Sequence, residues 1–263
     1  MTSTSLRLFD AALDLLVPVP CVGCGAPHTQ LCAACRTELE GARPRAARPH
    51  AAPPGLPEVY AATSYEGATR QILLAHKERG ALRLAHPLGR ALADAVRAAV
   101  PVGAAARAAP LLLVPMPSAA ATVRARGHDP TRRLTLVAAR TLRAAGVPAR
   151  ALSVLRQRRG TADQSELGAA ERLRNLSGAL TVPAGRRAQL GRGRIVLVDD
   201  LVTTGATLAD AARALAEAGG DVLAAAVVAA TVRRDARPGA GLAGAGVGPG
   251  AVVGPGAGAG QPG

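Results

Sequence analysis

VLVDDLVTTGATL, Val196 to Leu208, is the stretch that decides how the rest of the chain is interpreted. The run Ile195–Val198 is typical of a strand buried on both faces, and Asp199 and Asp200 follow it directly. The chain then turns through a threonine-rich loop into an alanine-rich helix, which Gly219-Gly220 closes. The pattern therefore predicts a strand, a tight loop and a helix N-terminus, with both acids solvent-facing at the carboxyl end of the strand.

Such a loop can direct backbone N–H groups and threonine hydroxyls at one point, where the helix dipole favours an anion. Two carboxylates would repel a ligand that was phosphate alone, but they suit the hydroxyls of a polyol. Together these features indicate a ribose 5-phosphate, with its hydroxyls on Asp199 and Asp200. Its phosphate would bind the loop residues Thr203, Thr204, Gly205, Ala206 and Thr207.

Three other interpretations of the stretch can be compared with this one. A Walker loop is excluded because the Gly-Lys-Ser/Thr ending is missing. A response-regulator receiver needs a lysine further along the chain, and the only lysine, Lys77, comes earlier. An ordinary βα unit with a capped helix stays as the alternative. The stretch resembles the ribose-phosphate signature of type I phosphoribosyltransferases.

Length and composition bound the function classes. A chain of 263 residues can hold one α/β domain and a small accessory module. The formal charge of +14 comes almost wholly from arginine in an alanine-rich chain, which is typical of a GC-rich genome. With 1% aromatic residues there is no base-stacking platform, although electrostatic attraction to nucleic acid or to a pyrophosphate stays open. We find no membrane-spanning run, so we expect no membrane insertion and a cytoplasmic protein.

Four cysteines stand in two Cys-x-x-Cys pairs near the N-terminus, Cys21, Cys24, Cys32 and Cys35. This spacing predicts a closed tetrahedral zinc site with a structural role. Two disulfides are the alternative, which a reducing cytosol disfavours.

The domain boundaries follow from composition. We expect an N-terminal helix and zinc module over 1–40, a proline-rich linker over 41–57, an α/β domain over 58–235, and a disordered Gly/Pro/Ala tail over 236–263. Alternating strands and helices in 58–235 predict a mainly parallel sheet, whose ligands bind outside the carboxyl ends of its strands.

Three further features of this domain follow from local sequence signals. A buried strand ends in Pro115-Met116-Pro117-Ser118, a rigid turn that can present Ser118 to an anion or can be a simple strand exit. Asp129 and Pro130 predict the start of a helix, as N-cap and first residue. The basic segment Arg156–Gln164 is either a surface arm or a lid that closes on phosphates.

Taken in order, these pieces resemble the ComF family, the phosphoribosyltransferase-like proteins linked to natural competence. The motifs that carry the resemblance are the four cysteines, Tyr65-Glu66-Gly67 with Lys77 and Gly80, Val114–Pro117, Arg126-Gly127, the spacing Gln164, Leu167, Arg172, Asn175, and VLVDDLVTTGATL. The chain departs from the family's pattern at His128-Asp129-Pro130, where an aromatic residue, Asn and Gln usually stand.

The resemblance implies a type I phosphoribosyltransferase fold that binds phosphoribosyl pyrophosphate with magnesium and transfers the phosphoribosyl group. It implies that Pro117 and Ser118 form the pyrophosphate loop and that Arg158–Gln164 is a mobile catalytic loop. Arg158 and Arg159 of this loop would then be catalytic residues beside Asp199 and Asp200.

We add Lys77 to the pyrophosphate site, because a lone lysine in an arginine-rich chain marks a place that arginine does not suit. The competing class is a non-enzymatic DNA-uptake factor. Such a protein would bind single-stranded DNA or a helicase-like competence ATPase and use the phosphoribosyl site as a ligand sensor.

Overall fold

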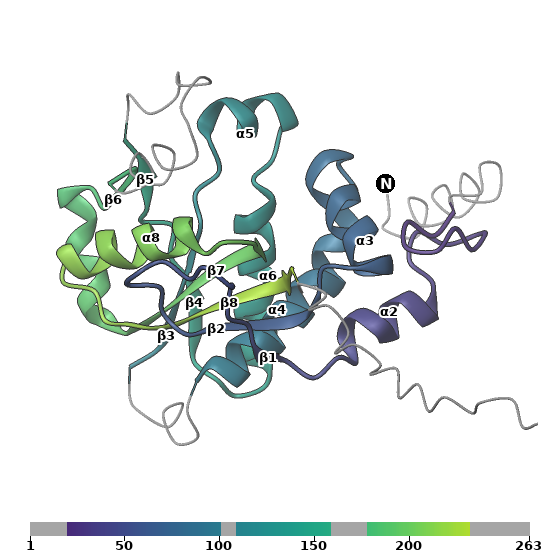
Figure 1. Cartoon of the computed structure of the whole chain (residues 1–263), viewed down its shortest axis with the longest axis horizontal. Coiled ribbons are helices and arrows are strands. Elements are labelled where there is room, and N and C mark those ends of the chain that lie inside the picture. The colour runs from purple at the N-terminus through teal and green to yellow at the C-terminus, as the bar shows by residue number, and fades with distance from the viewer. Residues whose placement is uncertain (1–19, 101–108, 159–177, 232–263) are drawn as a thin grey trace, which may run out of the picture. The chain divides into compact units, whose positions relative to one another are not determined.

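The computed structural model describes residues 20–100, 109–158 and 178–231 of the chain. Its central feature is a six-stranded sheet with the order β1-β2-β8-β7-β3-β4 (Figure 1). Every neighbouring pair in this sheet is parallel except β1 and β2, which are antiparallel. The strands are β1 (Arg45–Ala46), β2 (Val59–Ser64), β3 (Leu111–Pro115), β4 (Ala149–Ala151), β7 (Arg194–Val202) and β8 (Val222–Ala230). The expected α/β class with a mostly parallel sheet is therefore confirmed.

Strand β7 lies inside the sheet and is buried on both faces, as its sequence predicts. Val196 and Val198 belong to the hydrophobic core on one face, whereas Ile195 and Leu197 belong to the core on the other face. This alternation follows from the two-residue period of a strand. Because both faces are covered, β7 carries apolar residues without a break from Ile195 to Val198.

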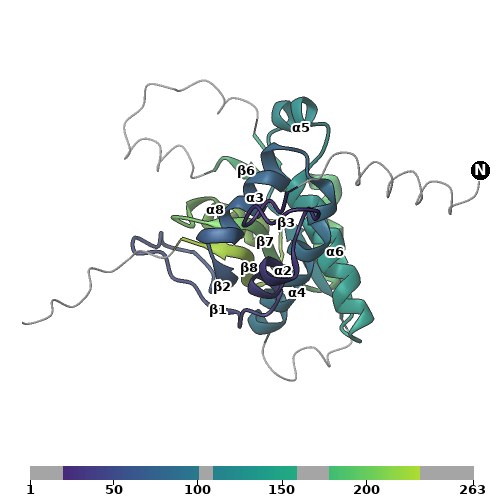
Figure 2. The ribbon, with the colours of Figure 1, turned by 90° about the vertical axis from the view of Figure 1, so that its right-hand side faces the viewer.

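Helices cover the two faces of the sheet, as Figure 2 shows. The core on one face is built from α3 (Gly67–Glu78), α4 (Ala85–Ala99) and α6 (Pro130–Ala144), through residues such as Ile72, Leu92 and Leu134. The core on the other face contains Leu208 and Leu215 of α8 (Ala206–Glu217). Parallel neighbours need such helical crossovers, and α6 and α8 provide them between β3 and β4 and between β7 and β8.

Local signals place several helix ends correctly. Asp129 accepts a hydrogen bond from the Arg132 backbone N–H at 3.0 Å and caps α6, whose first residue is Pro130. Helix α8 ends at Glu217, before the paired glycines. The shorter elements are η1 (Leu82–Leu84), α5 (Ala120–Arg126), η2 (Ala184–Arg192), and the antiparallel pair β5 (Arg156–Gln157) and β6 (Leu180–Thr181).

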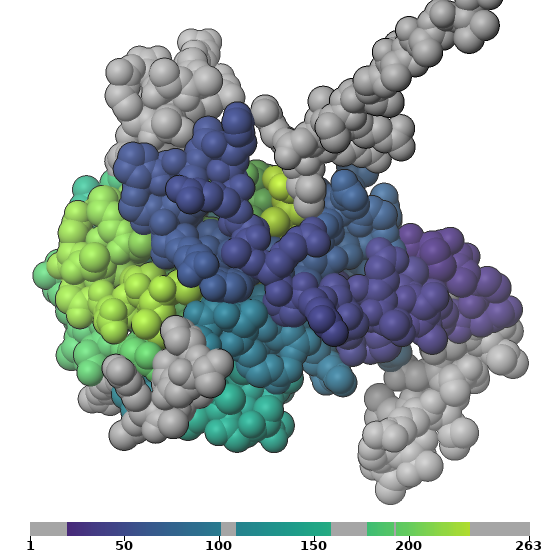
Figure 3. All heavy atoms as spheres, turned by 60° about the horizontal axis from the view of Figure 1, so that its bottom comes forward, coloured from purple at the N-terminus to yellow at the C-terminus, as the bar shows by residue number. Residues whose placement is uncertain are grey.

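The N-terminal cysteine segment packs directly on the α/β domain. Its helix α2 (Ala33–Glu40) contacts α3 and α4, and Leu39 is part of the same core as Ile72 of α3 (Figure 3). Strand β1 falls within the segment 41–57 that we expected to be linker, and it pairs with β2 at the edge of the sheet. Part of the expected linker is therefore a sheet strand.

Some expectations lie outside the described residues: the helix before the cysteines, the tail over 236–263 and most of the basic loop that includes Arg159. Among the helices of the described ranges, none has the length and apolar character needed to cross a membrane.

Candidate functional site

The carboxyl ends of β3 and β7 meet at one edge of the sheet and line a cleft of about 400 Å³, which we call the carboxyl-edge cleft. Its lining residues are Lys77, Met116, Pro117, Ser118, Ala119, Thr122, Arg126, Thr131, Asp199, Asp200, Leu201, Thr203 and Thr207. Segments far apart in the sequence thus bring the two acids, two of the loop threonines, the proline-serine turn and the lone lysine to one place.

The acid pair sits in the last part of β7 rather than after it. Asp199 is half-buried, and its carboxylate accepts a hydrogen bond from the Asp200 backbone N–H at 2.8 Å. The Asp200 side chain is 8% exposed. Our expectation that both acids face solvent is therefore wrong for Asp200, because α3 covers its side chain with Lys77. Burial raises the pKa of Asp199 well above its usual range, and the Asp200 carboxylate raises it further.

Lys77 reaches the cleft from the last turn of α3. Its Nζ lies 2.8 Å from Asp200 Oδ2, and its side chain is 38% exposed. Desolvation acts to lower the pKa of Lys77, but the negative charges of Asp200 and Asp199 raise it by more. The lysine is therefore protonated at neutral pH. Its ammonium group pairs with the buried Asp200 carboxylate, and the exposed part of its side chain lines the cleft.

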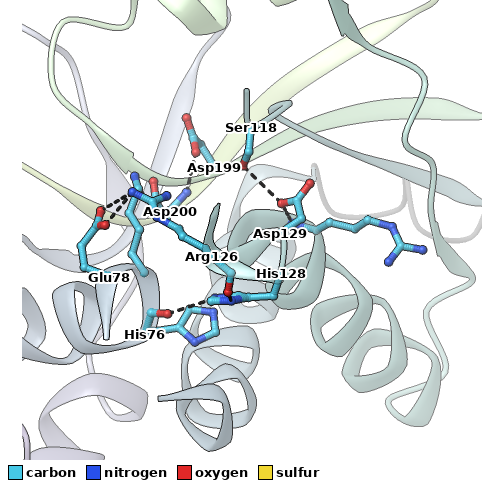
Figure 4. A network of polar contacts seen from close by, with 10 residues as sticks. His76, Glu78, Ser118, Arg126, His128, Asp129, Asp199 and Asp200 are labelled. Atoms are coloured by element: carbon cyan, nitrogen blue, oxygen red, sulfur yellow. Dashed lines mark hydrogen bonds and ion pairs between the residues drawn. The ribbon is translucent and has the colours of Figure 1, made fainter. Parts of the chain in front are cut away.

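A second cation lies at the rim of the cleft. Arg126, the last residue of α5, donates to Glu78 Oε1 at 2.7 Å and to Oε2 at 2.6 Å (Figure 4). Both contacts come from Arg126 Nη2, and because Glu78 directly follows Lys77, this ion pair ties the end of α3 to the end of α5. Our sequence reasoning gave Arg126 no site role, although the Arg126-Gly127 motif was visible. Thr122 and Thr131 also line the cleft, and no sequence signal singled them out.

The turn after β3 is anchored to the start of α6. Ser118 Oγ donates to Asp129 Oδ1 at 3.4 Å, and the same carboxylate oxygen caps α6 (Figure 4). His128 contacts two backbone carbonyl oxygens, that of Arg126 through Nδ1 at 3.1 Å and that of His76 through Nε2 at 3.4 Å. These contacts fix the loop Arg126–Asp129 against α3 and hold Ser118 at the cleft.

The threonine loop divides into residues that face the cleft and residues that shape the turn. Thr203 and Thr207 are exposed and line the cleft. Thr204 Oγ1 accepts a hydrogen bond from the Ala206 backbone N–H at 3.4 Å. Gly205 has φ of +78°, and a Cβ there would lie 2.8 Å from a methyl carbon of Leu56. The turn into α8 is therefore formed by Thr204, Gly205 and Ala206. The described lining of the cleft does not include these three residues.

The expected catalytic arginines are not placed at the cleft by the described residues. Arg158 is exposed beyond the end of β5, and its backbone N–H donates to Ala179 O at 2.8 Å. It is not part of the described cleft lining, and Arg159 lies outside the described ranges.

The four cysteines form a second site. The sulfur atoms of Cys21, Cys24, Cys32 and Cys35 all lie within 4.8 Å of one another, and none is in a disulfide. Cys24 Sγ and Cys32 Sγ are 3.6 Å apart, which is close to the separation of two ligands on a tetrahedral zinc with bonds of about 2.3 Å. The cluster can therefore hold a metal ion such as zinc.

The backbone around the cluster favours the thiolate of Cys21. Burial acts to raise the pKa of Cys21, but hydrogen bonds from the backbone N–H groups of Cys32, Cys24 and Gly23 outweigh it and lower the pKa to about 6. Burial raises the pKa of Cys35, and its sulfur neighbours raise it further. A Cβ on Gly23 would lie 2.8 Å from Cys35 Sγ, so only glycine fits beside the cluster.

No protein-family model matches the chain, and no curated protein matches it either. The fold and the two sites thus stand on their own geometry: a mixed α/β domain with a mostly parallel six-stranded sheet, an acid-lined cleft at its carboxyl edge, and four clustered cysteines at the N-terminal end of the described chain.

Proposed function

We propose that the carboxyl-edge cleft binds phosphoribosyl pyrophosphate together with Mg²⁺, and that the protein transfers the phosphoribosyl group to an acceptor. The observation that carries the proposal is the convergence of two acids, two threonines, a serine turn and a lysine on one cleft of about 400 Å³. Resemblance of the stretch Val196–Leu208, which contains the acids and the threonines, to the type I phosphoribosyltransferase signature supports it.

Charge and hydrogen-bonding capacity divide the cleft into three parts in this proposal. Thr203 and Thr207, at the N-terminus of α8, offer hydroxyl donors to the 5-phosphate, where the helix dipole is favourable. Asp199 and Asp200 accept hydrogen bonds from the ribose hydroxyls. Lys77 offers a cation to the pyrophosphate, and the Ser118 turn lies beside it.

Magnesium suits the donors that are present. It prefers oxygen ligands, and it is usually held by one or two carboxylates together with substrate phosphates. Asp199 and Asp200 are the cleft's carboxylates. A magnesium ion bound with the substrate would neutralise charge on the leaving pyrophosphate.

The chain's own groups contribute positioning and electrostatic stabilisation. Transfer breaks the bond between ribose C1 and the pyrophosphate oxygen and forms a bond between C1 and the acceptor. Positive charge builds up on the ribose ring, next to the carboxylates, and negative charge builds up on the pyrophosphate, next to Lys77. Stabilisation of both charges by fixed groups favours the transition state over the bound substrate.

We propose that the four cysteines hold one structural zinc. A closed tetrahedral set leaves no position for a reacting ligand. Because Cys21 and Cys35 are buried in the same core as α3 and α4, the metal would stabilise the attachment of α2 to the α/β domain.

The order of motifs supports a relation to the ComF family, and we infer from it a role in DNA uptake. The protein would act in the cytoplasm, with single-stranded DNA or a helicase-like ATPase as its partner. In that setting the cleft could serve catalysis or ligand sensing, and the experiment below separates the two.

Isothermal titration calorimetry with phosphoribosyl pyrophosphate and Mg²⁺ tests binding, and pyrophosphate release over a panel of nucleobases and amines tests turnover. We expect Thr207→Val to weaken binding about tenfold, the equivalent of one lost hydrogen bond to a charged group. Thr37→Val, an exposed threonine of α2 that does not line the cleft, is the matched control. No measurable binding by the parent protein would refute the proposal, and binding without release would make the protein a sensor.

A further inference from the structure

A second hollow lies next to the carboxyl-edge cleft, over α4 and α6. Its volume is about 540 Å³, and residues of η1, α4, α6 and the loop Gly127–Asp129 line it. We call it the α4–α6 groove. The loop that precedes α6 separates it from the cleft, because Arg126 lines the cleft and Gly127 lines the groove.

The groove gathers exposed apolar side chains. Leu82 is 40% exposed and Leu136 is 36% exposed, and they are the only large hydrophobic side chains with such exposure among the described residues. Both line this groove, and Val137 lies partly buried beside them. Leu82 comes from η1 and Leu136 from α6. The fold therefore brings two leucines from different elements into one groove, where both remain in contact with water. Contact of these side chains with an apolar partner would be favourable.

The groove also gathers cations. Arg132, Arg133 and Arg140 are exposed on α6 and line the groove. No ion pair between described residues includes any of the three. The only acid in the groove's described lining is Asp129. One oxygen of its carboxylate accepts hydrogen bonds from Arg132 N and from Ser118 Oγ. Among the described residues that line it, the groove therefore carries a net positive charge, with Asp129 as the single acid against these arginines.

Cations and leucine alternate along α6. Arg132, Leu136 and Arg140 are four residues apart and lie on one face of the helix, and Arg133 and Val137 lie on the adjacent face. A partner that matches this pattern presents an apolar stripe with carboxylates on its flanks. An amphipathic helix laid into a groove has this geometry.

Nucleic acid fits the pattern less well. Its backbone would meet the arginines, but exposed bases are usually stacked on aromatic rings, and the groove's described lining contains no Phe, Tyr or Trp. Two exposed leucines instead favour aliphatic side chains of a protein.

We propose that the α4–α6 groove is a docking site for an acidic amphipathic helix of a partner protein, with the helix's leucine-like side chains between Leu82 and Leu136. Its carboxylates pair with Arg132, Arg133 and Arg140. This site does not depend on the ligand of the carboxyl-edge cleft.

A synthetic peptide tests the proposal directly on the full-length protein. The peptide has about 16 residues, enough to form a helix in water, with leucines on one face and glutamates on the other. Fluorescence anisotropy of the labelled peptide gives its affinity. Two control peptides carry serine in place of leucine, or lysine in place of glutamate, and an oligothymidine of similar length tests nucleic acid.

Two groove variants and one matched control are compared with the parent protein. Arg132→Glu with Arg140→Glu reverses two groove charges, and Leu136→Ser removes an apolar contact without opening a buried cavity. Arg48→Glu with Arg187→Glu makes the same change of charge at two exposed arginines outside the described groove lining. Circular dichroism and urea unfolding establish that each variant is folded.

We expect the parent protein to bind the leucine–glutamate peptide more tightly than either control peptide. The double reversal in the groove should weaken this binding about tenfold or more, and the control reversal about twofold or less. Leu136→Ser should weaken it about threefold to tenfold. Equal affinities of the groove and control variants would overturn the proposal, as would no binding of the peptide. Tighter binding of the oligothymidine through the same arginines would identify the groove as a nucleic-acid site instead.

Discussion

The ion pair between Lys77 and Asp200 gives the sharpest test of the site. Replacing Asp200 with Asn keeps the shape of the side chain and removes its charge, and replacing Lys77 with Met removes the partner. At the observed 2.8 Å, the direct attraction is about 6 kcal/mol for an effective dielectric constant of 20. Most of this is offset, because Asp200 loses hydration and Lys77, with 38% of its side chain exposed, is screened by solvent.

We therefore expect a net coupling of about 1 to 2 kcal/mol from a double-mutant cycle on Lys77→Met and Asp200→Asn. The free energy of unfolding would be measured by urea titration at pH 7. A cycle on Arg36 and Glu40, an i,i+4 pair on α2, is the control, for which about 0.3 to 0.5 kcal/mol is expected. Its two side chains are 46% and 17% exposed.

The same variants test the proposed ligand. Each single change should weaken the binding of phosphoribosyl pyrophosphate about tenfold or more, because each removes one charged partner of the ligand. A coupling for the cleft pair that does not exceed the control would refute the argument from burial. A coupling free energy of about 1 to 2 kcal/mol together with unchanged ligand affinity would instead show that the pair stabilises the fold without contacting the ligand.

Four other predictions follow from the same geometry. Lys77→Arg keeps the charge but brings a planar guanidinium against a buried carboxylate, so we expect calorimetry to show weaker ligand binding; an affinity equal to the parent's would leave the lysine with a purely local role. Because burial raises the pKa of Asp199, its contribution to folding stability is fully present below the ordinary carboxyl pKa and is lost as pH rises through the raised value. Asp199→Asn should remove that loss and raise the free energy of unfolding at pH 7, whereas parallel stability–pH curves for the two proteins would contradict the shift. Chelation should remove zinc, as measured by elemental analysis of the dialysed protein, and should lower the thermal midpoint of unfolding of the described domain, because the cysteine segment shares its core. A midpoint unchanged after the metal has been removed would count against this. Gly205→Ala should destabilise the protein by about 1 to 2 kcal/mol, since an alanine there is strained at φ of +78° and crowds Leu56, while Gly185→Ala, where an added Cβ meets nothing within 4 Å, should be near neutral in the same urea titration.

Local features of this protein could be predicted from the sequence because they depend on neighbouring residues. The apolar run before Asp199 predicted β7, and the glycines after Glu217 predicted the end of α8. Asp129 and Pro130 predicted the first residues of α6. In each case the signal is a periodicity, a cap or a backbone preference that acts within a few residues. The short spacing of the cysteines likewise predicted their clustering.

Edge strand β1 shows where such signals end. Its two residues, Arg45 and Ala46, are exposed and have no periodic pattern. They are a strand only because β2 offers free hydrogen-bonding groups at the edge of the sheet. Composition alone predicted a linker at this position.

Contacts between distant segments were decided by the tertiary structure alone. The sequence placed Asp200 just after a strand, which predicted exposure, but in the structure its side chain is 8% exposed and pairs with Lys77 of α3. Leu82 and Leu136 look like ordinary apolar positions in the sequence, and only the packing of α4 against α6 leaves both exposed in one groove. A residue's own segment determines its backbone, whereas its burial and its charge partner depend on which other segments the sheet order brings beside it.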